Sequence, residues 1–231
     1  MTYAADLHLH SPYAMATSPS ITLDSMASLA GIKGIDLLAT ADFTHPAWLA
    51  DLKAKLVPLD DGLFRLRERA LTAGGAAIAA RQRMPVRRAP RFVLGTEVSC
   101  VYAQGGRTRR LHLLVLAPDF GAVDRLCAAL APHGKLASDG RPTLRLSARE
   151  AVAAALGADE RCEVIPAHAW TPWYGVYGSK GGFDSLAECF GDMLPHLHAM
   201  ETGLSSDPSM NWRVPELDGL SIVSFSDAHS P

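Results

Sequence analysis

The stretch "ADLHLH", residues 5–10, places two histidines one residue apart near the start of the chain. In an extended segment, the side chains of His8 and His10 point to the same side. Two imidazoles about 6–7 Å apart along a strand are spaced to hold one metal ion between them. The alternative is an ordinary polar edge strand in a chain with nine histidines. The rest of the sequence has to decide between these interpretations.

The composition is that of a globular protein with a substantial apolar core. Hydrophobic residues make up 48% of the 231 residues and charged residues 20%, which is ordinary for this class. The net charge of −2 at pH 7 does not favour a general nucleic-acid-binding surface, although bound metal ions would add charge that this count omits. Arginines are concentrated in 80–91 and 106–110, which are either solvated loop faces or cationic patches.

The cysteines and the hydropathy point to a reduced, cytoplasmic protein without a membrane partner. No two cysteines form a C-x-x-C pair, and the sequence contains no signal-like segment and no long apolar span. This argues against a zinc ribbon and a disulfide framework. We expect the four to be small buried apolar residues: Cys100, Cys127, Cys162 and Cys189.

Strand-like and helix-like segments alternate along the chain, as in a parallel sheet or barrel. Helices are expected at 23–33, 46–56, 120–131 and 147–156, with a further weak helix or helix break in the Ala-rich 70–82. Strands are expected at 4–9, 35–40, 91–99, twice around the Gly-Gly turn of 99–118, and at 162–168, 197–203 and 220–229. Thr22 and Gly34 are the expected caps of the first helix, and Ser147 with Glu150 predicts a capping box that starts the last, with Gly157 after it.

Nearly all candidate metal ligands follow an expected strand or lie near its end, where a (βα) barrel places its chemistry. They are His8, His10, Asp42, His45, Glu97, His112, His168, Asp227 and His229. Imidazole and carboxylate together suit zinc, manganese or iron. Nine groups exceed the need of one tetrahedral ion. Two or three ions that share a bridging carboxylate would leave no buried charge unpaired. Glu97 is the candidate bridge. Such a centre best fits hydrolysis of a phosphate ester.

This order of motifs resembles the PHP (polymerase and histidinol phosphatase) domain. The resemblance runs in order through "DLHLHS", "ATADFTHP", "GTEVS", "RRLHLLVLAP", "IPAHAW" and "FSDAHS". It implies an α/β fold, a distorted (βα)7 TIM-like barrel, with metals at the C-terminal ends of the strands. Residues 1–231 are then expected to form a single catalytic domain.

The same resemblance implies a ligand set. One ion would be held by His8, His10, Glu97 and Asp227, a second by Glu97, His112 and His168, and a third would lie near His229 with Asp42 or His45. Phe43 stands where many PHP sequences carry a histidine, so two ions are better supported than three. Zinc is favoured over manganese or magnesium. The expected catalytic groups are Asp227, Glu97 and His229.

Longer stretches resemble one branch of that superfamily, the DNA-repair endonuclease Q family. They are "DFTHPAW", "GTEVSCVYAQGGRTRRLHLLVLAP", "SDGRP", "PAHAWTPWYGVYGSKGGFDSLAECF" and "ETGLSSDPSMNWR". The resemblance implies a metal-dependent nuclease that nicks DNA 5′ of a deaminated base (uracil, hypoxanthine or xanthine) or an abasic site. Members usually continue past "SDAHSP" into a zinc-binding module and a helical region, whereas this sequence ends there.

Aromatic and polar residues near the expected site are candidates for binding an extruded base. The set is Trp170, Trp173, Tyr174, Ser179, Asn211, Trp212 and Arg213. The alternatives are a well-packed barrel loop for the first group and an ordinary surface loop for the second. The stretch "SDGRP" is interpreted as a tight turn.

Two further histidine features are expected to be structural. The second H-x-H, His196 and His198, begins a strand rather than ending one, so Glu201 is the better candidate for supporting a metal ligand. His133 resembles a helix C-terminal cap.

Other functions compete with the nuclease. A histidinol-phosphatase-like enzyme would use the same metals on a small phosphate, and a non-catalytic, metal-stabilised repair domain would only dock. A zinc amidohydrolase fits less well, because the chain has the closing D-x-H and no lysine at a strand end.

Overall fold

The computed structural model describes residues 3–67 and 89–231. The Ala-rich 70–82, for which a weak helix or a break was expected, and most of the arginine-rich 80–91 lie outside these residues. Within the described part of the chain, no helix combines the length and apolarity needed to cross a membrane.

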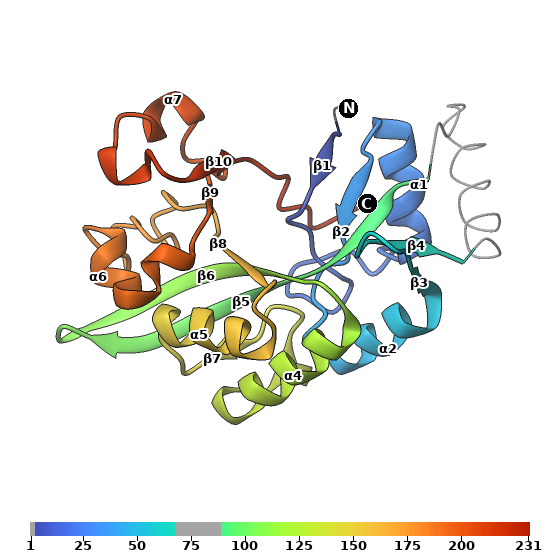
Figure 1. Cartoon of the computed structure of the whole chain (residues 1–231), viewed down its shortest axis with the longest axis horizontal. Coiled ribbons are helices and arrows are strands. Elements are labelled where there is room, and N and C mark those ends of the chain that lie inside the picture. Colours follow the sequence, from blue (N-terminus) through green and yellow to red (C-terminus); the bar gives the residue numbers. More distant parts are fainter. Residues whose placement is uncertain (1–2, 68–88) are drawn as a thin grey trace.

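A mixed eight-stranded sheet forms the centre of the molecule (Figure 1). β1 (Ala5–Asp6), β2 (Leu37–Ala39) and β5 (Arg91–Gln104) run parallel to one another, and β6 (Arg107–Ala117) pairs with β5 in antiparallel fashion. The sheet also includes β3 (Leu56–Pro58), β4 (Phe64–Leu66), β7 (Thr143–Leu144) and β8 (Glu163–Pro166). β9 (Ala199–Glu201) and β10 (Ser221–Val223) form a separate parallel pair.

The mixed α/β class is as expected, but the described residues do not form the expected closed (βα)7 barrel. β8 and β9 are neighbours that belong to different sheets. The C-terminal segment joins the first strand region through an isolated bridge between Leu9 and Ala228. The long β5–β6 hairpin also departs from a βα repeat, because Gly105 and Gly106, both at positive φ, form a tight turn that needs no crossover helix.

The helices begin largely where local capping signals predict. They are α1 (Leu23–Lys33), α2 (Pro46–Lys55), α4 (Phe120–Leu130), α5 (Ala148–Ala158), α6 (Leu186–Phe190) and α7 (Pro208–Asn211). The Thr22 side chain accepts a hydrogen bond from the Ser25 N–H, and Ser147 forms the expected capping box with Glu150. Gly157 lies inside α5 rather than after it, because the helix continues to Ala158.

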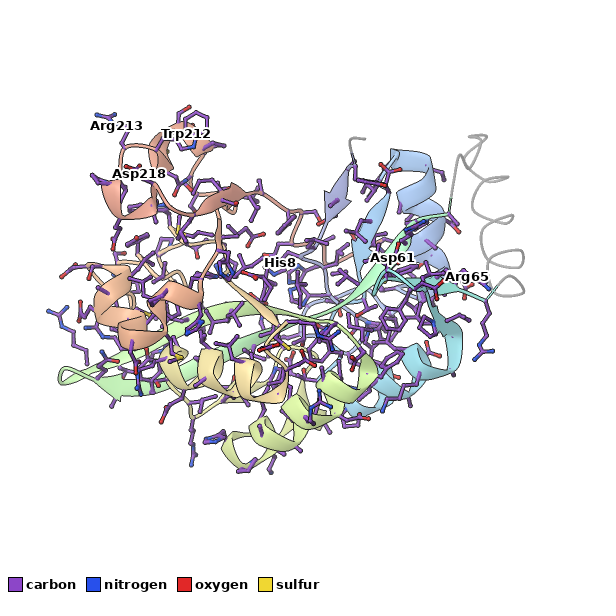
Figure 2. The ribbon with its side chains drawn as sticks, in the orientation of Figure 1. His8, Asp61, Arg65, Trp212, Arg213 and Asp218 are labelled. Carbon is purple, nitrogen blue, oxygen red and sulfur yellow. The ribbon has the colours of Figure 1, made fainter. Side chains whose placement is uncertain are left out.

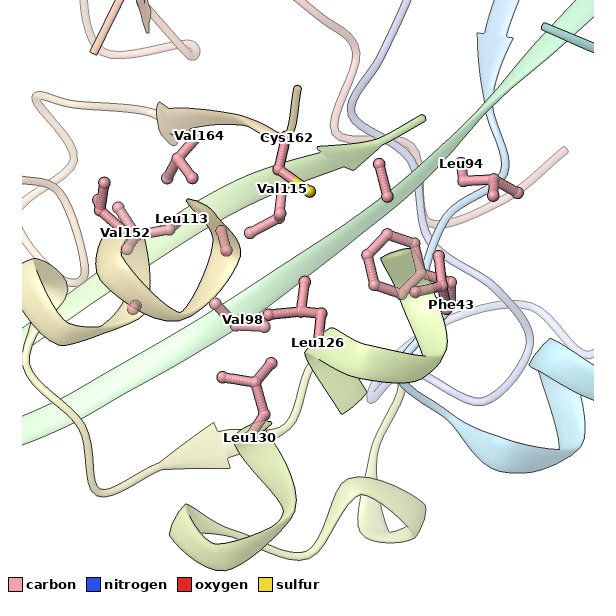
Figure 3. Packing of buried hydrophobic residues seen from close by; sticks show 14 of the residues in the cluster. Phe43, Leu94, Val98, Leu113, Val115, Leu126, Leu130, Val152, Cys162 and Val164 are labelled. Carbon is pink, nitrogen blue, oxygen red and sulfur yellow. The ribbon is translucent and has the colours of Figure 1, made fainter. Parts of the chain in front are cut away.

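The two faces of the β5–β6 hairpin have different environments because side chains alternate along a strand. Leu94 and Val98 of β5 and Leu113 and Val115 of β6 face the main apolar core, where α4 and α5 pack (Figure 3). Leu126 is one of the residues that α4 contributes to this core. The opposite face carries Glu97, His112 and a small apolar cluster that includes Leu114. The hairpin therefore separates the core from the candidate site.

Candidate metal centre

Glu97 lies at the middle of a buried histidine cluster. Its side chain is fully buried, and Oε1 lies 2.9 Å from His112 Nδ1 and 3.2 Å from His168 Nε2. His10 Nε2 is 3.4 Å from the other oxygen, Oε2. In the β-ladder His112 is opposite Ser99, two residues beyond Glu97 on the same face. This pairing brings the two strands' polar side chains together.

His8 and His10, the histidines of the H-x-H motif, lie side by side with ring centroids 5.5 Å apart. His8 Nδ1 is 2.9 Å from Glu201 Oε2, and His10 Nδ1 is 3.2 Å from Asp42 Oδ1. Because a carboxylate only accepts, these bonds place a proton on Nδ1, so that in the neutral ring Nε2 carries the lone pair. Glu201 and Asp42 therefore orient the rings so that Nε2 faces the centre.

His8 Nε2 is buried without a hydrogen-bond partner. It lies 3.5 Å from Glu97 Oε1 and 3.4 Å from Asp227 Oδ1. A lone pair facing two carboxylates is unfavourable unless a proton or a metal ion lies between them. This arrangement fits a divalent cation with nitrogen and oxygen ligands.

His168 repeats the same orientation from another loop. Its Nδ1 lies 2.8 Å from Thr171 Oγ1, and the Thr171 hydroxyl has carbonyl acceptors of its own, so the oxygen can accept from Nδ1–H. His168 Nε2 then faces Glu97 and lies 3.2 Å from His112 Nδ1. Glu201 also accepts from the His168 backbone N–H, at 2.8 Å. One buried carboxylate thus supports two histidines, the supporting role expected for Glu201.

The closing D-x-H motif completes the centre on its more open side. His229 Nδ1 donates to the backbone carbonyl of Asp227 at 2.8 Å, and its ring centroid lies 4.6 Å from that of His10. Asp227 Oδ1 is 3.1 Å from His10 Nε2. The side chains of Asp227 and His229 are each 36% exposed, so substrate could approach from this side.

The described residues contain three sets of side chains. Inside each set, the ligand atoms lie within 4.8 Å of one another. The sets are His8–His10–Glu97, Glu97–His112–His168 and His10–Asp227–His229. The structure thus brings His229 together with His10 and Asp227. Asp42 and His45, the other partners considered for His229, lie outside these sets. Asp42 contacts the outer nitrogen of His10, and His45 stacks on Tyr13 at the start of α2.

Three residues of the centre have a left-handed backbone. Asp42, His168 and Asp227 have φ of 39°, 31° and 50°, a conformation that costs non-glycine residues free energy and is concentrated at functional sites. Two glycines pack against these residues too closely to carry a side chain. A Cβ on Gly140 would lie 2.4 Å from Asp42 Oδ2, and one on Gly203 would lie 2.5 Å from His168 Cβ. The loops around the centre are therefore closely fitted.

The electrostatics show a centre that attracts positive charge. Burial opposes protonation of His8, but Glu97 and Glu201 hold its pKa well above the usual value. Burial likewise opposes protonation of His10, but Asp227 and Asp42 raise its pKa to about 9. Burial raises the pKa of Glu97, yet His112 and His8 hold it well below its ordinary range. Glu97 therefore stays ionised and draws positive charge to the inward nitrogens.

Arg141 is a member of the site that the sequence interpretation missed. Its Nη1 donates to Glu97 Oε2 at 3.1 Å, and its side chain is only 22% exposed. The stretch "SDGRP" does form a turn, in which Asp139 Oδ1 accepts from the Arg141 N–H. The turn signal correctly described the backbone. It gave no indication that the arginine side chain points at Glu97 on β5.

The candidate substrate-binding residues lie in two separate regions of the structure. Trp173 is 54% exposed and lies with its ring 5.6 Å from the Arg110 guanidinium carbon, while Tyr174 stacks on His112 at 4.2 Å. Ser179 is exposed. Trp170 packs on Tyr177.

The second group, on and just after α7, lies farther from the metal centre. Figure 2 shows Trp212 and Arg213 at the outer edge of the α7 region, away from His8. Trp212 is 69% exposed. Asn211 is fully buried, and its amide bonds Trp170 Nε1, Ser206 Oγ and the Asp207 carbonyl. Its donors and acceptor are thus committed within the protein.

The features expected to be structural lie away from the centre. His196 is exposed at the end of a 3-10 turn, and His198 is exposed with Nδ1 3.0 Å from Glu163. His133 ends a 3-10 turn after α4. The cysteines are free, and Cys127 is the one that is only partly buried.

The chain has relatives among known proteins, although no family profile matches it. It is 26% identical over 239 aligned residues to the uncharacterized protein YqxK of Bacillus subtilis, covering 98% of this chain and 54% of YqxK. The crystal structure of the lesion-specific endonuclease PfuEndoQ from Pyrococcus furiosus covers the whole chain with 31% identity and a TM-score of 0.80. A structure of endonuclease Q with a 27-mer duplex, whose abasic lesion is at the active site, matches equally well.

These matches confirm the resemblance to endonuclease Q that the motifs indicated. The structure of a proposed metal-dependent phosphoesterase from Bifidobacterium adolescentis shares the fold more distantly, with 15% identity, 99% coverage of this chain and a TM-score of 0.57. The chain spans about half the length of YqxK and of PfuEndoQ, 54% and 49% respectively.

Proposed function

We propose that this chain carries the catalytic centre of a metal-dependent DNA endonuclease. The reaction is hydrolysis of the phosphodiester on the 5′ side of a deaminated base (uracil, hypoxanthine or xanthine) or an abasic site. The observation that carries the proposal is the set of inward-facing histidine nitrogens around Glu97 and Asp227. The similarity of the whole chain to about half of a lesion-specific endonuclease supports DNA as the substrate.

The donor set fits two or three divalent ions. His8, His10, Glu97 and Asp227 would hold one, Glu97, His112 and His168 a second, and His10, Asp227 and His229 would offer a third position. Mixed imidazole and carboxylate donors favour zinc, with manganese or magnesium as alternatives. When bound, such ions lower the pKa of a water and stabilise negative charge on phosphoryl oxygens.

The protein's own groups contribute orientation and proton transfer. Glu201, Asp42 and Thr171 hold the imidazoles with Nε2 inward, so that little rearrangement is needed when ligands bind. Asp227, whose side chain is 36% exposed, would accept a proton from the attacking water. Where the third position holds no ion, His229, whose Nδ1 bonds the Asp227 carbonyl, would as an imidazolium donate its Nε2 proton to the leaving oxygen.

Aromatic side chains would bind the damaged nucleotide. In this proposal Trp173 and Tyr174, with Ser179 nearby, stack against or contact the extruded base beside His112. Trp212 and Arg213 contact the DNA farther from the cut. Trp170 and Asn211 support this surface through their mutual hydrogen bond of 2.8 Å.

A cleavage assay tests the proposal directly. Purified protein is incubated with zinc, manganese or magnesium and an end-labelled duplex that carries one deoxyuridine, deoxyinosine or abasic site. We expect one cut immediately 5′ of the lesion, a 3′-hydroxyl and 5′-phosphate at the nick, and no cutting of the undamaged duplex. D227N should abolish the cut while retaining the fold, as judged by circular dichroism.

The matched control is H198N, because His198 is an exposed histidine that contacts only a surface carboxylate, Glu163. It should cleave like the wild type. Hydrolysis of a small phosphate monoester without lesion cleavage would reject the nuclease in favour of a phosphatase. Lesion binding that D227N leaves unchanged, without any hydrolysis, would favour a docking domain.

A further inference from the structure

Arg141 brings a positive side chain into a centre otherwise built from histidines and carboxylates. Its guanidinium contacts Glu97 Oε2, the same oxygen that faces His10 Nε2. Among the described residues, Glu97 is the one hydrogen-bond partner of this guanidinium. A guanidinium has five N–H donors, so most of them are free for another acceptor.

The loop that carries Arg141 is held firmly in place. Asp139 Oδ1 accepts from the backbone N–H groups of Met15 and Arg141, at 3.3 and 2.9 Å. The Gly140 N–H donates to the Tyr13 carbonyl at 2.9 Å, and the Gly140 carbonyl accepts from Thr44 Oγ1 at 3.3 Å. These bonds join the loop to the segments that follow His10 and Asp42. The guanidinium is therefore positioned together with the metal ligands.

The balance of charge around Glu97 indicates a role for the Arg141 guanidinium. Without cations in the centre, Arg141 shares with His8 and His112 in neutralising the buried Glu97. Divalent ions bound to Glu97 would supply that neutralisation themselves, which leaves a largely buried guanidinium without a full counter-charge. Such a cation is costly unless an anion approaches it. Planar guanidinium donors match two phosphate oxygens at once.

We propose that Arg141 forms a phosphate-binding subsite at the edge of the metal centre and holds a non-bridging oxygen of the scissile phosphodiester. The inference rests on the proposed function, because it assigns a part of the same substrate to a residue of this chain. Arg141 then contributes to binding and orienting the phosphate. It is not needed to hold the metal.

The test compares R141Q and R141K with R145Q in the zinc-loaded full chain. Arg145 is an exposed arginine directly after β7, four residues beyond Arg141, and its backbone N–H, which bonds the His133 carbonyl, is unaffected by the change. Inorganic phosphate is the probe, and its affinity is measured by calorimetric titration. Bound zinc per chain is measured by elemental analysis of the same samples.

We expect R141Q to weaken phosphate binding about 10- to 100-fold, the effect of losing a charge-assisted contact. R141K should fall between R141Q and the wild type, because it keeps the charge and loses the planar fork. R145Q should bind phosphate like the wild type. Zinc content should be unchanged in all three variants, and the KM for lesion DNA should rise more in R141Q than kcat falls.

Two results would overturn the inference: wild-type phosphate affinity in R141Q, or loss of zinc from R141Q, which would make Arg141 a positioning residue for Glu97. The proposed function fails separately. If the wild type binds phosphate through Arg141 but cuts no lesion DNA, the subsite stands and the nuclease assignment is wrong. If R141Q cuts lesion DNA with the wild-type KM, the nuclease stands and the subsite is wrong.

Discussion

The two faces of the β5–β6 hairpin place adjacent residues in opposite roles. Leu113 is fully buried in the apolar core, and His112 beside it points at Glu97. Val98 and Glu97 differ in the same way on the partner strand. One face gains stability from removing apolar surface from water. The other keeps buried charges close together, at a cost that bound cations would offset.

The largest effect should come from the charged face. Glu97→Gln removes the carboxylate shared by two of the ligand sets, so we expect lesion cleavage to fall by about 10³-fold or more. Zinc per chain should fall as well, as measured by elemental analysis. Val98→Ala, one residue along on the core face, should keep its cleavage rate per folded molecule. Equal losses in the two variants would contradict the division between the faces.

The core face should instead respond in stability. Leu113→Ala leaves a cavity in the packed core and is expected to lower the free energy of unfolding by about 2–5 kcal/mol. Urea denaturation of the metal-free protein measures this difference. The control is Leu204→Ala, because Leu204 is 95% exposed, and its effect should stay within about 0.5 kcal/mol. A small effect at Leu113 would mean that the core face tolerates loss of packing.

A smaller effect is expected one step outside the charged centre. Glu201→Gln should weaken zinc binding about 10- to 100-fold, because it weakens the hydrogen bond that orients His8. Glu163→Gln is the matched control, since Glu163 bonds the exposed His198, and competition with a chelator should give it the wild-type zinc affinity. If the two variants behave alike, burial of the carboxylate does not matter for the metal.

The smallest expected effect is that of pH on the stability of the metal-free protein, and therefore on the rise in Tm that zinc causes. The pKa of His10 is raised from 6.5 to about 9, so its protonation stabilises the fold fully below pH 6.5 and this contribution disappears as pH rises through 9. Zinc needs the neutral imidazole. The rise in Tm caused by zinc should therefore be larger at pH 9 than at pH 6.5, as differential scanning fluorimetry would show. A zinc effect that shrinks with pH would contradict this account.

Local elements and several ligand candidates could be predicted from the sequence. The Thr22 cap, the Ser147–Glu150 capping box and the strand over 91–99 depend on neighbouring residues alone. The H-x-H pair and the closing D-x-H are likewise local, and the structure brings both motifs into one centre. Their ligand roles remain proposals that the metal measurements test.

Long-range contacts decided the rest. The strand–helix alternation is typical of a parallel sheet or barrel, and the PHP resemblance implied a distorted (βα)7 barrel. Whether β8 hydrogen-bonds to β9 depends on chain segments far apart, and here they belong to different sheets. The same applies to the group beside His229, which is His10 rather than Asp42 or His45.

The sequence by itself determined the residue types of the centre and the strands and turns that carry them, because those follow from short-range spacing and backbone preference. Tertiary structure alone decided which nitrogen of His8 and of His10 faces inward, through the distant acceptors Glu201 and Asp42. It also directed Arg141 from a surface-like turn to Glu97. A side chain's direction and charge partner are set by packing between loops, which no local pattern contains.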